Sequence, residues 1–249
     1  MAELVLIPAD IETWIFAALL CASFAGSFIT VSMGIGGGAL LLAVMASLIP
    51  PAALIPVHGV IQLGSNAGRL GLLFKHVRWS AFPAFAVGSV AGVAFGGTVV
   101  VELSPAIVQI GVGAFVIWTV FATAPRWLGR WPAIAGLVSS FLTMFFGATG
   151  TFVASFSKSL GLPRHSHVAT HAALMTLQHT LKVLMFGFLG FAFGPWATVV
   201  LAMILAGFLG TYAGRLLLDQ MNDHLFKRAL DVVLVLISLR LIYAGITNI

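Results

Sequence analysis

Five polar side chains recur along one apolar segment, residues 58–69, at intervals that place them on a single face of an α-helix. The intervals are those of positions i, i+4, i+7, i+8 and i+11. The residues are His58, Gln62, Ser65, Asn66 and Arg69. Imidazole, amide and hydroxyl groups form hydrogen bonds and arginine adds positive charge, so this face has the chemistry of a small-anion site.

A second polar series lies 113 residues further along the chain. Its members are His171, Met175, Gln178, His179 and Lys182, four of which are polar. The same shift places Ser27 on Ser140, Thr30 on Thr143, Gly34 on Gly147, Gly37 on Gly150 and Pro50 on Pro163. We interpret the chain as an internal duplication in which each half keeps a polar face that ends in a cation.

Neither Arg69 nor Lys182 has an acidic residue at helical spacing to pair with. An ionisable group at membrane depth costs about 2.5–3.5 kcal/mol on insertion scales, so it usually faces a cavity or another polar group. Alternatively each cation extends along its helix to the lipid headgroups, which suits Arg69 better because it lies nearer the end of its segment. Ser65 or Gln178 alone is better explained by hydrogen bonding between helices. The functional interpretation therefore rests on the whole set.

Each half also has a glycine-rich break before a short apolar segment, GIGGG at 34–38 and GATGT at 147–151. Glycine lets the backbone turn sharply and approach a ligand, and helix N-termini favour anions. Broken helices in corresponding positions of two halves point to a transporter's substrate site, although close helix packing also explains glycine clusters. The candidate binding residues from the breaks are Gly36, Gly37, Gly38, Gly150 and Thr151.

The composition is that of an integral membrane protein. Hydrophobic residues make up 60% of the chain and charged residues 8%, against about 45–50% and about 25% in soluble domains. Strand-like alternation is absent, so helices are expected. The net charge of +5 comes from cations in short loops, where membrane topology places them, so nucleic acid is not an expected partner.

The expected fold is an all-α integral membrane protein with two inverted repeats, about eight long and two short segments in all. Residues 1–123 form the first repeat, 124–131 a cytoplasmic linker and 132–249 the second repeat of one transport domain. Five segments per half, counting a short or re-entrant helix after each glycine break, turn the second half upside down. Parallel repeats of four simple spans are the alternative.

The charges favour the inverted arrangement under the positive-inside rule. Lys75, Arg78, Arg126, Arg130, Arg164, Arg215, Lys227 and Arg228 fall on one side, and Glu3, Asp10, Glu12 and Glu102 on the other. Arg240 is an exception, close enough to the outer end of its helix to reach the headgroups. We therefore expect both termini outside.

Other classes of protein remain open at this point. His165, His167 and His171 have a spacing that could hold a metal, but no acid or thiol completes the set. A haem held by His58 and His171, or an enzyme with histidine bases, is also conceivable. No Walker A, nucleophile elbow or HExxH motif is present, so we expect no catalytic residue, no metal and no cofactor.

At MGIGGGALL, HGVIQLGSNAGRLGLLFKHVRW and LGLPRHSHVATHAALMTLQHTLKV the sequence resembles the TauE/SafE family of sulfite exporters, also called TSUP, and the resemblance covers nearly the whole chain. It implies a multi-pass protein of the bacterial inner (plasma) membrane that exports sulfite, sulfoacetate or a related sulfonate. GATGT replaces the more usual glycine triplet of the second half. An importer of another small organic anion is the alternative.

The expected mechanism is alternating access of the two halves around a site near the membrane midplane. Arg69 and Lys182 would supply charge, while His58, Asn66, Gln178 and His179 would donate hydrogen bonds to the anion. The expected partners are a small anionic substrate and the lipid bilayer, with a homodimer left open.

Overall fold

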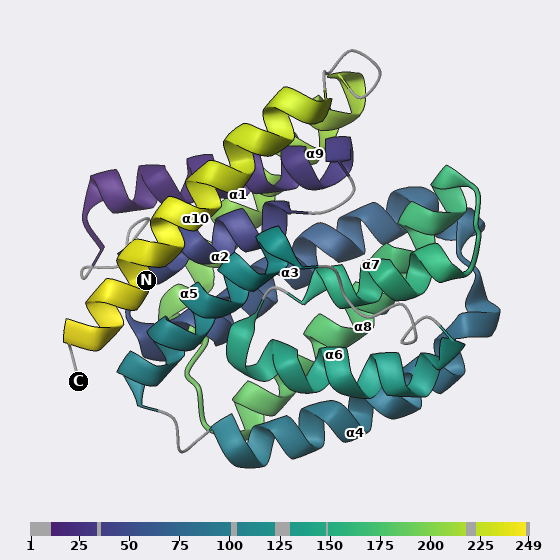
Figure 1. The fold of residues 1–249 in the computed structure, drawn as a ribbon, viewed down its shortest axis with the longest axis horizontal. Helices are drawn as coiled ribbons and strands as arrows, with labels where there is room; N and C mark the ends of the chain where they lie inside the picture. The colour runs from purple at the N-terminus through teal and green to yellow at the C-terminus, as the bar shows by residue number, and fades with distance from the viewer. Residues whose placement is uncertain are drawn as a thin grey trace, which may run out of the picture.

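The structure, a computed structural model, describes residues 11–33, 36–100, 104–122, 130–147, 149–217 and 223–247. Within these ranges the chain forms α-helices, short 3₁₀ helices and connecting turns, with no β-strand (Figure 1). The first half contains α1 (Thr13–Met33), α2 (Gly37–Leu48), α3 (Pro51–Leu73), α4 (Phe82–Val100) and α5 (Pro105–Phe121). The second contains α6 (Pro132–Phe146), α7 (Gly150–Ser159), α8 (Arg164–Phe188), α9 (Ala197–Leu217) and α10 (Asp223–Thr247). The predicted all-helical fold is confirmed for the described residues.

Glycines and prolines set the boundaries of the short helices α2 and α7. Gly36 precedes α2 with φ 102°, and Gly147 ends α6 with φ 71°, values that residues with a Cβ rarely adopt. Pro50 and Pro163 stand immediately before α3 and α8. Residues 34, 35 and 148 of the two breaks lie outside the described residues. Each short helix therefore follows a glycine turn and precedes a proline.

Four helices are long and apolar enough to cross a bilayer, judged by length and composition. These candidate spans are Thr13–Ser32, Trp79–Val100, Gly194–Gly214 and Leu230–Thr247 within the described chain. The second includes the 3₁₀ helix η2 (Trp79–Ala81) and the third includes η4 (Gly194–Trp196). Helices α2, α5 and α6 are shorter and apolar, and α3 and α8 carry the polar faces. The helices are consistent with a multi-pass membrane protein.

Large apolar side chains cover the outside of the bundle. On α4, α9 and α10 they include Val87, Phe95, Leu201, Leu205, Leu236 and Tyr243, each more than half exposed. The side chains of His58, Gln178, His179 and Lys182 are instead fully buried. An apolar exterior around a polar interior is the arrangement expected of a protein surrounded by lipid, where ionisable groups face inward.

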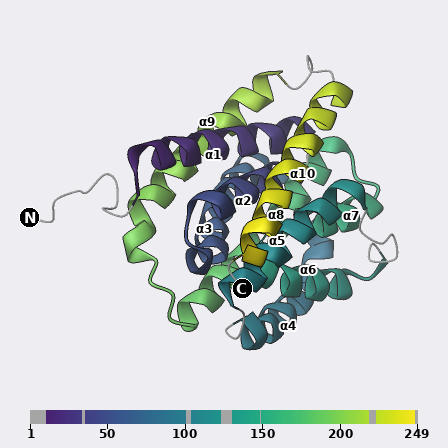
Figure 2. The same cartoon turned by 60° about the vertical axis from the view of Figure 1, so that its left-hand side comes forward.

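The two halves are interleaved, because α1 packs on α9 and α4 packs on α6 (Figures 1 and 2). Glycines allow this close approach. A Cβ at Gly88 would lie 1.8 Å from the carbonyl oxygen of Ala133, and a Cβ at Gly210 would lie 2.1 Å from that of Phe24. The other major pairs, α3 with α8 and α5 with α10, likewise combine one helix from each half.

Glycine contacts give the direction of each pair. Gly207, Gly210 and Gly214 lie against Ser23, Phe24 and Phe28, and Gly88, Gly92 and Gly96 lie against Ala133, Leu137 and Met144. Residue numbers thus rise together in the α1–α9 and α4–α6 pairs, which are parallel. Gly113 lies against Ser238 and Gly245 against Ala106, so α5 and α10 are antiparallel.

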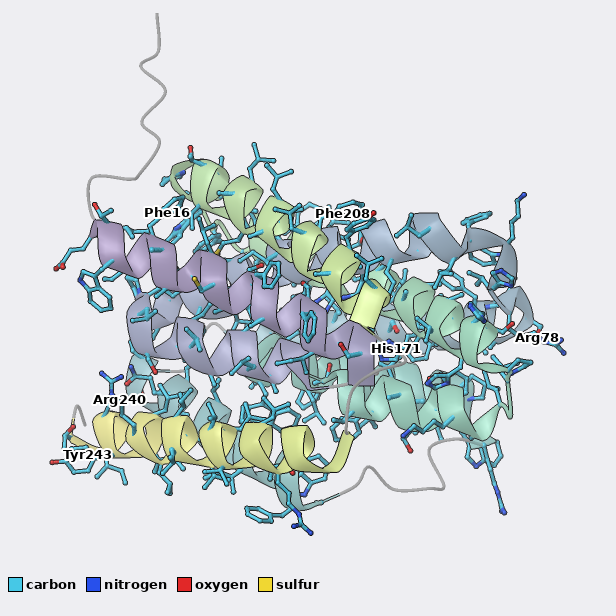
Figure 3. The ribbon with its side chains drawn as sticks, turned by 90° about the horizontal axis from the view of Figure 1, so that it is seen from above. Phe16, Arg78, His171, Phe208, Arg240 and Tyr243 are labelled. Atoms are coloured by element: carbon cyan, nitrogen blue, oxygen red, sulfur yellow. The ribbon has the colours of Figure 1, made fainter. Side chains whose placement is uncertain are left out.

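Arginines mark opposite ends of the bundle. Figure 3 places Arg78 near one end and Arg240 near the other. Arg78 lines a cavity of about 360 Å³ together with Pro132 and Leu160, so the segment after α3, the start of α6 and the segment after α7 meet at the Arg78 end. Arg126, Glu3, Asp10, Glu102 and most of the 124–131 linker lie outside the described residues.

Candidate functional site

Helices α3 and α8 pack against each other in opposite directions, along the polar faces that the sequence predicts. Near the start of α3, a Cβ at Gly59 would lie 2.8 Å from Lys182 Cε. Just beyond the end of α3, the backbone N–H of Arg78 donates to Thr170 Oγ1 at 2.9 Å. Residue numbers therefore fall along α8 as they rise along α3. The structure brings the two polar faces together inside the bundle.

Two equivalent histidines bond to the short helices of their own halves. His58 Nε2 lies 3.2 Å from the carbonyl oxygen of Gly38, and His171 Nε2 lies 3.3 Å from that of Gly150. A carbonyl oxygen can only accept, so the ring nitrogen donates in both cases. His58 Nδ1 is buried and has no partner among the described residues. In a singly protonated His58 ring that donates from Nε2, the free Nδ1 is an acceptor for a ligand, not the donor expected from the sequence.

Gln178 ties the second polar face to α6 and to the second glycine break. Its Nε2 donates to Ser139 Oγ at 3.0 Å and to Ser140 Oγ at 3.1 Å, while its Oε1 accepts from Thr149 Oγ1 at 3.2 Å. All four side chains are fully buried. Both ends of the amide are already bonded within the protein, so Gln178 positions the break instead of presenting the free donor that the sequence predicts.

We expect Gln178→Leu to lower the stability of the protein. The leucine would leave the hydroxyls of Ser139, Ser140 and Thr149 buried without this partner, at a cost of about 1–3 kcal/mol in the free energy of unfolding. Thermal unfolding in detergent measures the change. The matched control is Gln109→Leu on α5, where the glutamine is only partly buried. Equal stability of the two variants would contradict this role.

The hydroxyl groups of α6 and of Thr149, just before α7, are the part of the site that sequence reasoning missed. In the sequence, Ser140 and Thr143 serve only as matched positions of the repeat, and no role is predicted for Ser139 or Thr149. A usable signal was present, because the repeat keeps a Ser-x-x-Thr pattern at the end of both first helices, with Thr30 as the counterpart of Thr143.

Lys182 is a fully buried cation on α8. Its Nζ donates to Thr143 Oγ1 at 3.5 Å, and no acid in the described part of the chain forms an ion pair with it. His179, nearly one turn earlier, has both ring nitrogens buried without a hydrogen bond to any described residue. Its ring centroid lies 6.3 Å from that of His58. A positive charge and unpartnered ring nitrogens thus gather at one end of the joined polar faces.

Arg69 is buried on α3, with 5% of its surface exposed. Its two terminal nitrogens donate to Asn66 Oδ1 at 3.2 Å and to Ser65 Oγ at 3.4 Å. Ser65 Oγ lies 3.3 Å from Ser27 Oγ of α1, and Asn66 Nδ2 donates to the carbonyl oxygen of Gln62 at 2.8 Å. The guanidinium therefore folds back along α3 and does not extend toward lipid headgroups. Asn66, like Gln178, is already bonded at both ends of its amide.

The remaining candidates lie at the glycine breaks. Gly37 packs against α1, because a Cβ there would lie 1.6 Å from the carbonyl oxygen of Gly26. At Gly38 a Cβ would lie 2.3 Å from Gln62 Nε2, so the Gln62 amide rests on the backbone of α2. Thr151 Oγ1 is buried without a partner among the described residues. Both short helices thus begin beside the polar faces.

The metal alternative gains no support from the geometry. His167 and His171 have ring centroids 6.5 Å apart, and the ring of His165 lies instead near that of His76, with centroids 5.7 Å apart. Among the residues that the structure describes, no three His, Cys, Asp or Glu side chains are arranged to hold a metal ion.

A family model described as sulfite exporter TauE/SafE matches residues 18–241. This chain belongs to the TauE/SafE family. No curated protein and no solved structure gives a match in the corresponding comparisons. The TauE/SafE match covers both polar faces and both glycine breaks, so it confirms the resemblance found in the sequence.

Membership of the TauE/SafE family implies a membrane exporter of sulfite or a related sulfur-containing anion. The cations of α3 and α8 are buried inside an apolar exterior, as expected for ionisable groups of a membrane protein.

Proposed function

We propose that this TauE/SafE protein exports sulfite, sulfoacetate or a related sulfonate along the polar faces of α3 and α8. Two buried cations without an acidic partner in the described chain carry the proposal. A buried charge that lacks a partner is costly, and a bound anion would compensate it. The unpartnered ring nitrogens of His179 add hydrogen-bonding groups for the same ligand. Charge and hydrogen bonds without an activated nucleophile favour transport over catalysis.

The proposed mechanism is alternating access between two inverted repeats. In chain order the two halves relate α1 to α6, α3 to α8, α4 to α9 and α5 to α10. The relation converts the α1–α9 pair into the α6–α4 pair, and it exchanges the two members of the α3–α8 pair and of the α5–α10 pair. Helices exchanged by an axis in the membrane plane run antiparallel, whereas an axis along the membrane normal would leave them parallel. The antiparallel packing of α3 with α8, and of α5 with α10, supports the inverted arrangement.

In the proposed topology, repeats 1–123 and 132–249 form one transport domain in the bacterial inner membrane. The end marked by Arg78 faces the cytoplasm, which places the 124–131 linker inside and both termini outside. The ligand is a small anion and the surroundings are lipid. A homodimer is compatible with the exposed apolar surface.

The membrane potential suits export. An inside-negative potential drives an anion outward by about 2.3 kcal/mol per charge for each 100 mV. Export of a small anion therefore needs no coupling ion, whereas import would need one.

Purified protein in liposomes should pass radiolabelled sulfite, and Arg69→Met should reduce that flux about 10-fold or more. The expected loss corresponds to one charge-assisted hydrogen bond, about 1.5–3 kcal/mol. Lys75→Met is the matched control, because Lys75 is an exposed cation at the end of the bundle and should keep wild-type flux.

The wild-type measurement tests the function itself. Liposomes loaded in parallel with sulfite, sulfoacetate, thiosulfate and sulfate would rank the substrates. Absence of flux for every one of these anions would refute the proposed function. Full sulfite flux in Arg69→Met would show that Arg69 does not bind the substrate.

A further inference from the structure

The two cations of the site lie apart along the joined polar faces. Lys182 lies against Gly59, because a Cβ there would be 3.6 Å from Lys182 Nζ. The guanidinium of Arg69 bonds to Ser65 and Asn66. Gly59 and Ser65 are six residues apart on α3, about 9 Å at 1.5 Å per residue. Gln62 of α3 lies between these two levels.

Each cation lies near the histidine of the opposite half. Gly59 lies against Lys182 and the backbone N–H of Arg78 bonds to Thr170, so His58 lies level with Lys182, and Arg69 lies toward the His171 end of the polar face of α8. The 113-residue shift converts one cation–histidine pair into the other, since it relates His58 to His171 and Arg69 to Lys182. The antiparallel packing of α3 and α8 therefore creates two equivalent groups, each assembled from both halves.

Both groups contain buried polar atoms without a partner in the described chain. At the Lys182 end these atoms are His58 Nδ1 and both ring nitrogens of His179, and at the Arg69 end the atom is Arg69 Nε. A buried polar atom left without a hydrogen bond costs about 1–3 kcal/mol. A ligand bound at the Lys182 end and a ligand bound at the Arg69 end would each remove such a cost.

We infer that the protein has two anion sites in series, a Lys182 site with His58 and His179 and an Arg69 site with His171. The inference rests on the proposed function and deepens it. A small oxyanion contacts either cation but does not reach across the interval between Gly59 and Ser65, so one site near the midplane does not serve both charges.

The hydrogen-bonding pattern of the Lys182 site indicates the protonation state of its ligand. Lys182 offers donors, a singly protonated His179 ring has one donor and one acceptor, and a singly protonated His58 ring that donates from Nε2 has only an acceptor, at Nδ1. A singly protonated oxyanion such as hydrogen sulfite matches this set, because its oxygens accept from Lys182 and its proton can be donated to a histidine. Each site then holds one negative charge beside one cation.

The test is equilibrium binding of radiolabelled sulfite to the purified full-length protein in detergent, without oxygen. At saturation the wild-type protein should bind two equivalents per chain. Lys182→Met and Arg69→Met should each bind one equivalent, and the double variant none. The equivalent retained by each single variant also reports that the variant is folded.

Other outcomes separate the two proposals. One equivalent in the wild type, abolished by either substitution, would overturn the second site and leave the proposed function standing. Two equivalents in either single variant would overturn the assignment of the cations. Absence of binding and of liposome flux in the wild type would overturn the proposed function itself.

Discussion

Replacing Lys182 by methionine is expected to reduce sulfite flux about 10-fold or more and at the same time to stabilise the protein. The flux falls because a charge-assisted hydrogen bond to the anion, about 1.5–3 kcal/mol, is lost. Stability rises because the fully buried ammonium has Thr143 as its hydrogen-bond partner and no paired acid in the described chain. Apolar replacement of buried ionic groups has gained about 1–4 kcal/mol elsewhere. Thr143 still donates to the carbonyl oxygen of Gly147 at 3.1 Å.

Opposite signs in the two measurements separate a functional lysine from a structural one. Flux in liposomes and thermal unfolding in detergent are measured on the same preparation. Lys75→Met removes an exposed cation and should change neither quantity beyond a few tenths of a kcal/mol. If Lys182→Met lowered both the sulfite flux and the thermal stability, the role of the lysine would be to stabilise the helix bundle.

Substituting alanine for Gly88 is expected to separate α4 from α6 and destabilise the protein. The new Cβ would lie 1.8 Å from the carbonyl oxygen of Ala133 and 2.9 Å from the backbone nitrogen of Leu137, so whole helices must shift. Overpacking costs about 1–3 kcal/mol, occasionally more, and the helix propensity of alanine returns about 1 kcal/mol. A contact this short should give a cost near the upper end of the overpacking range, about 3 kcal/mol. After the gain in helix propensity, we expect a net loss of about 2 kcal/mol in the free energy of unfolding.

Gly71→Ala is the matched control for Gly88→Ala. Gly71 lies on α3, and a Cβ there would meet no atom within 4 Å. The substitution should therefore be neutral or stabilising by up to about 1 kcal/mol through helix propensity. Thermal unfolding of both variants in detergent tests the pair. If Gly88→Ala were as stable as Gly71→Ala, the close contact of α4 with α6 would be wrong.

Much of the local structure could be predicted from the sequence. The short segments expected after the two glycine breaks correspond to α2 and α7, which span Gly37–Leu48 and Gly150–Ser159. Both polar faces follow from helical spacing alone, because residues three and four apart share a face. Glycine and proline at fixed places in the repeat were enough to locate the breaks.

The contacts between helices could not be predicted in the same way. Spacing places Arg69 and Lys182 on polar faces, but only the antiparallel packing of α3 on α8 directs each cation toward the histidine of the other half. The same applies to Gln178, whose amide is saturated by hydroxyls of α6 and of the break before α7. Sequence reasoning on one helix supplies the groups that a site can use, and the neighbouring helices decide which of those groups remain free.

The interleaving of the halves also sets the order in which the molecule can be completed during synthesis. Ser23 of α1 donates to the carbonyl oxygen of Met203 on α9, which is made 180 residues later. At about 5–20 residues per second, roughly 10–40 s pass between the emergence of these two residues from the ribosome. During that interval α1 lies in the membrane without its parallel partner α9, and the hydroxyls of Ser23 and Ser27 are not yet covered by Gly207 of that helix. A nascent chain of this kind depends on lipid or the insertion machinery until its last helices arrive.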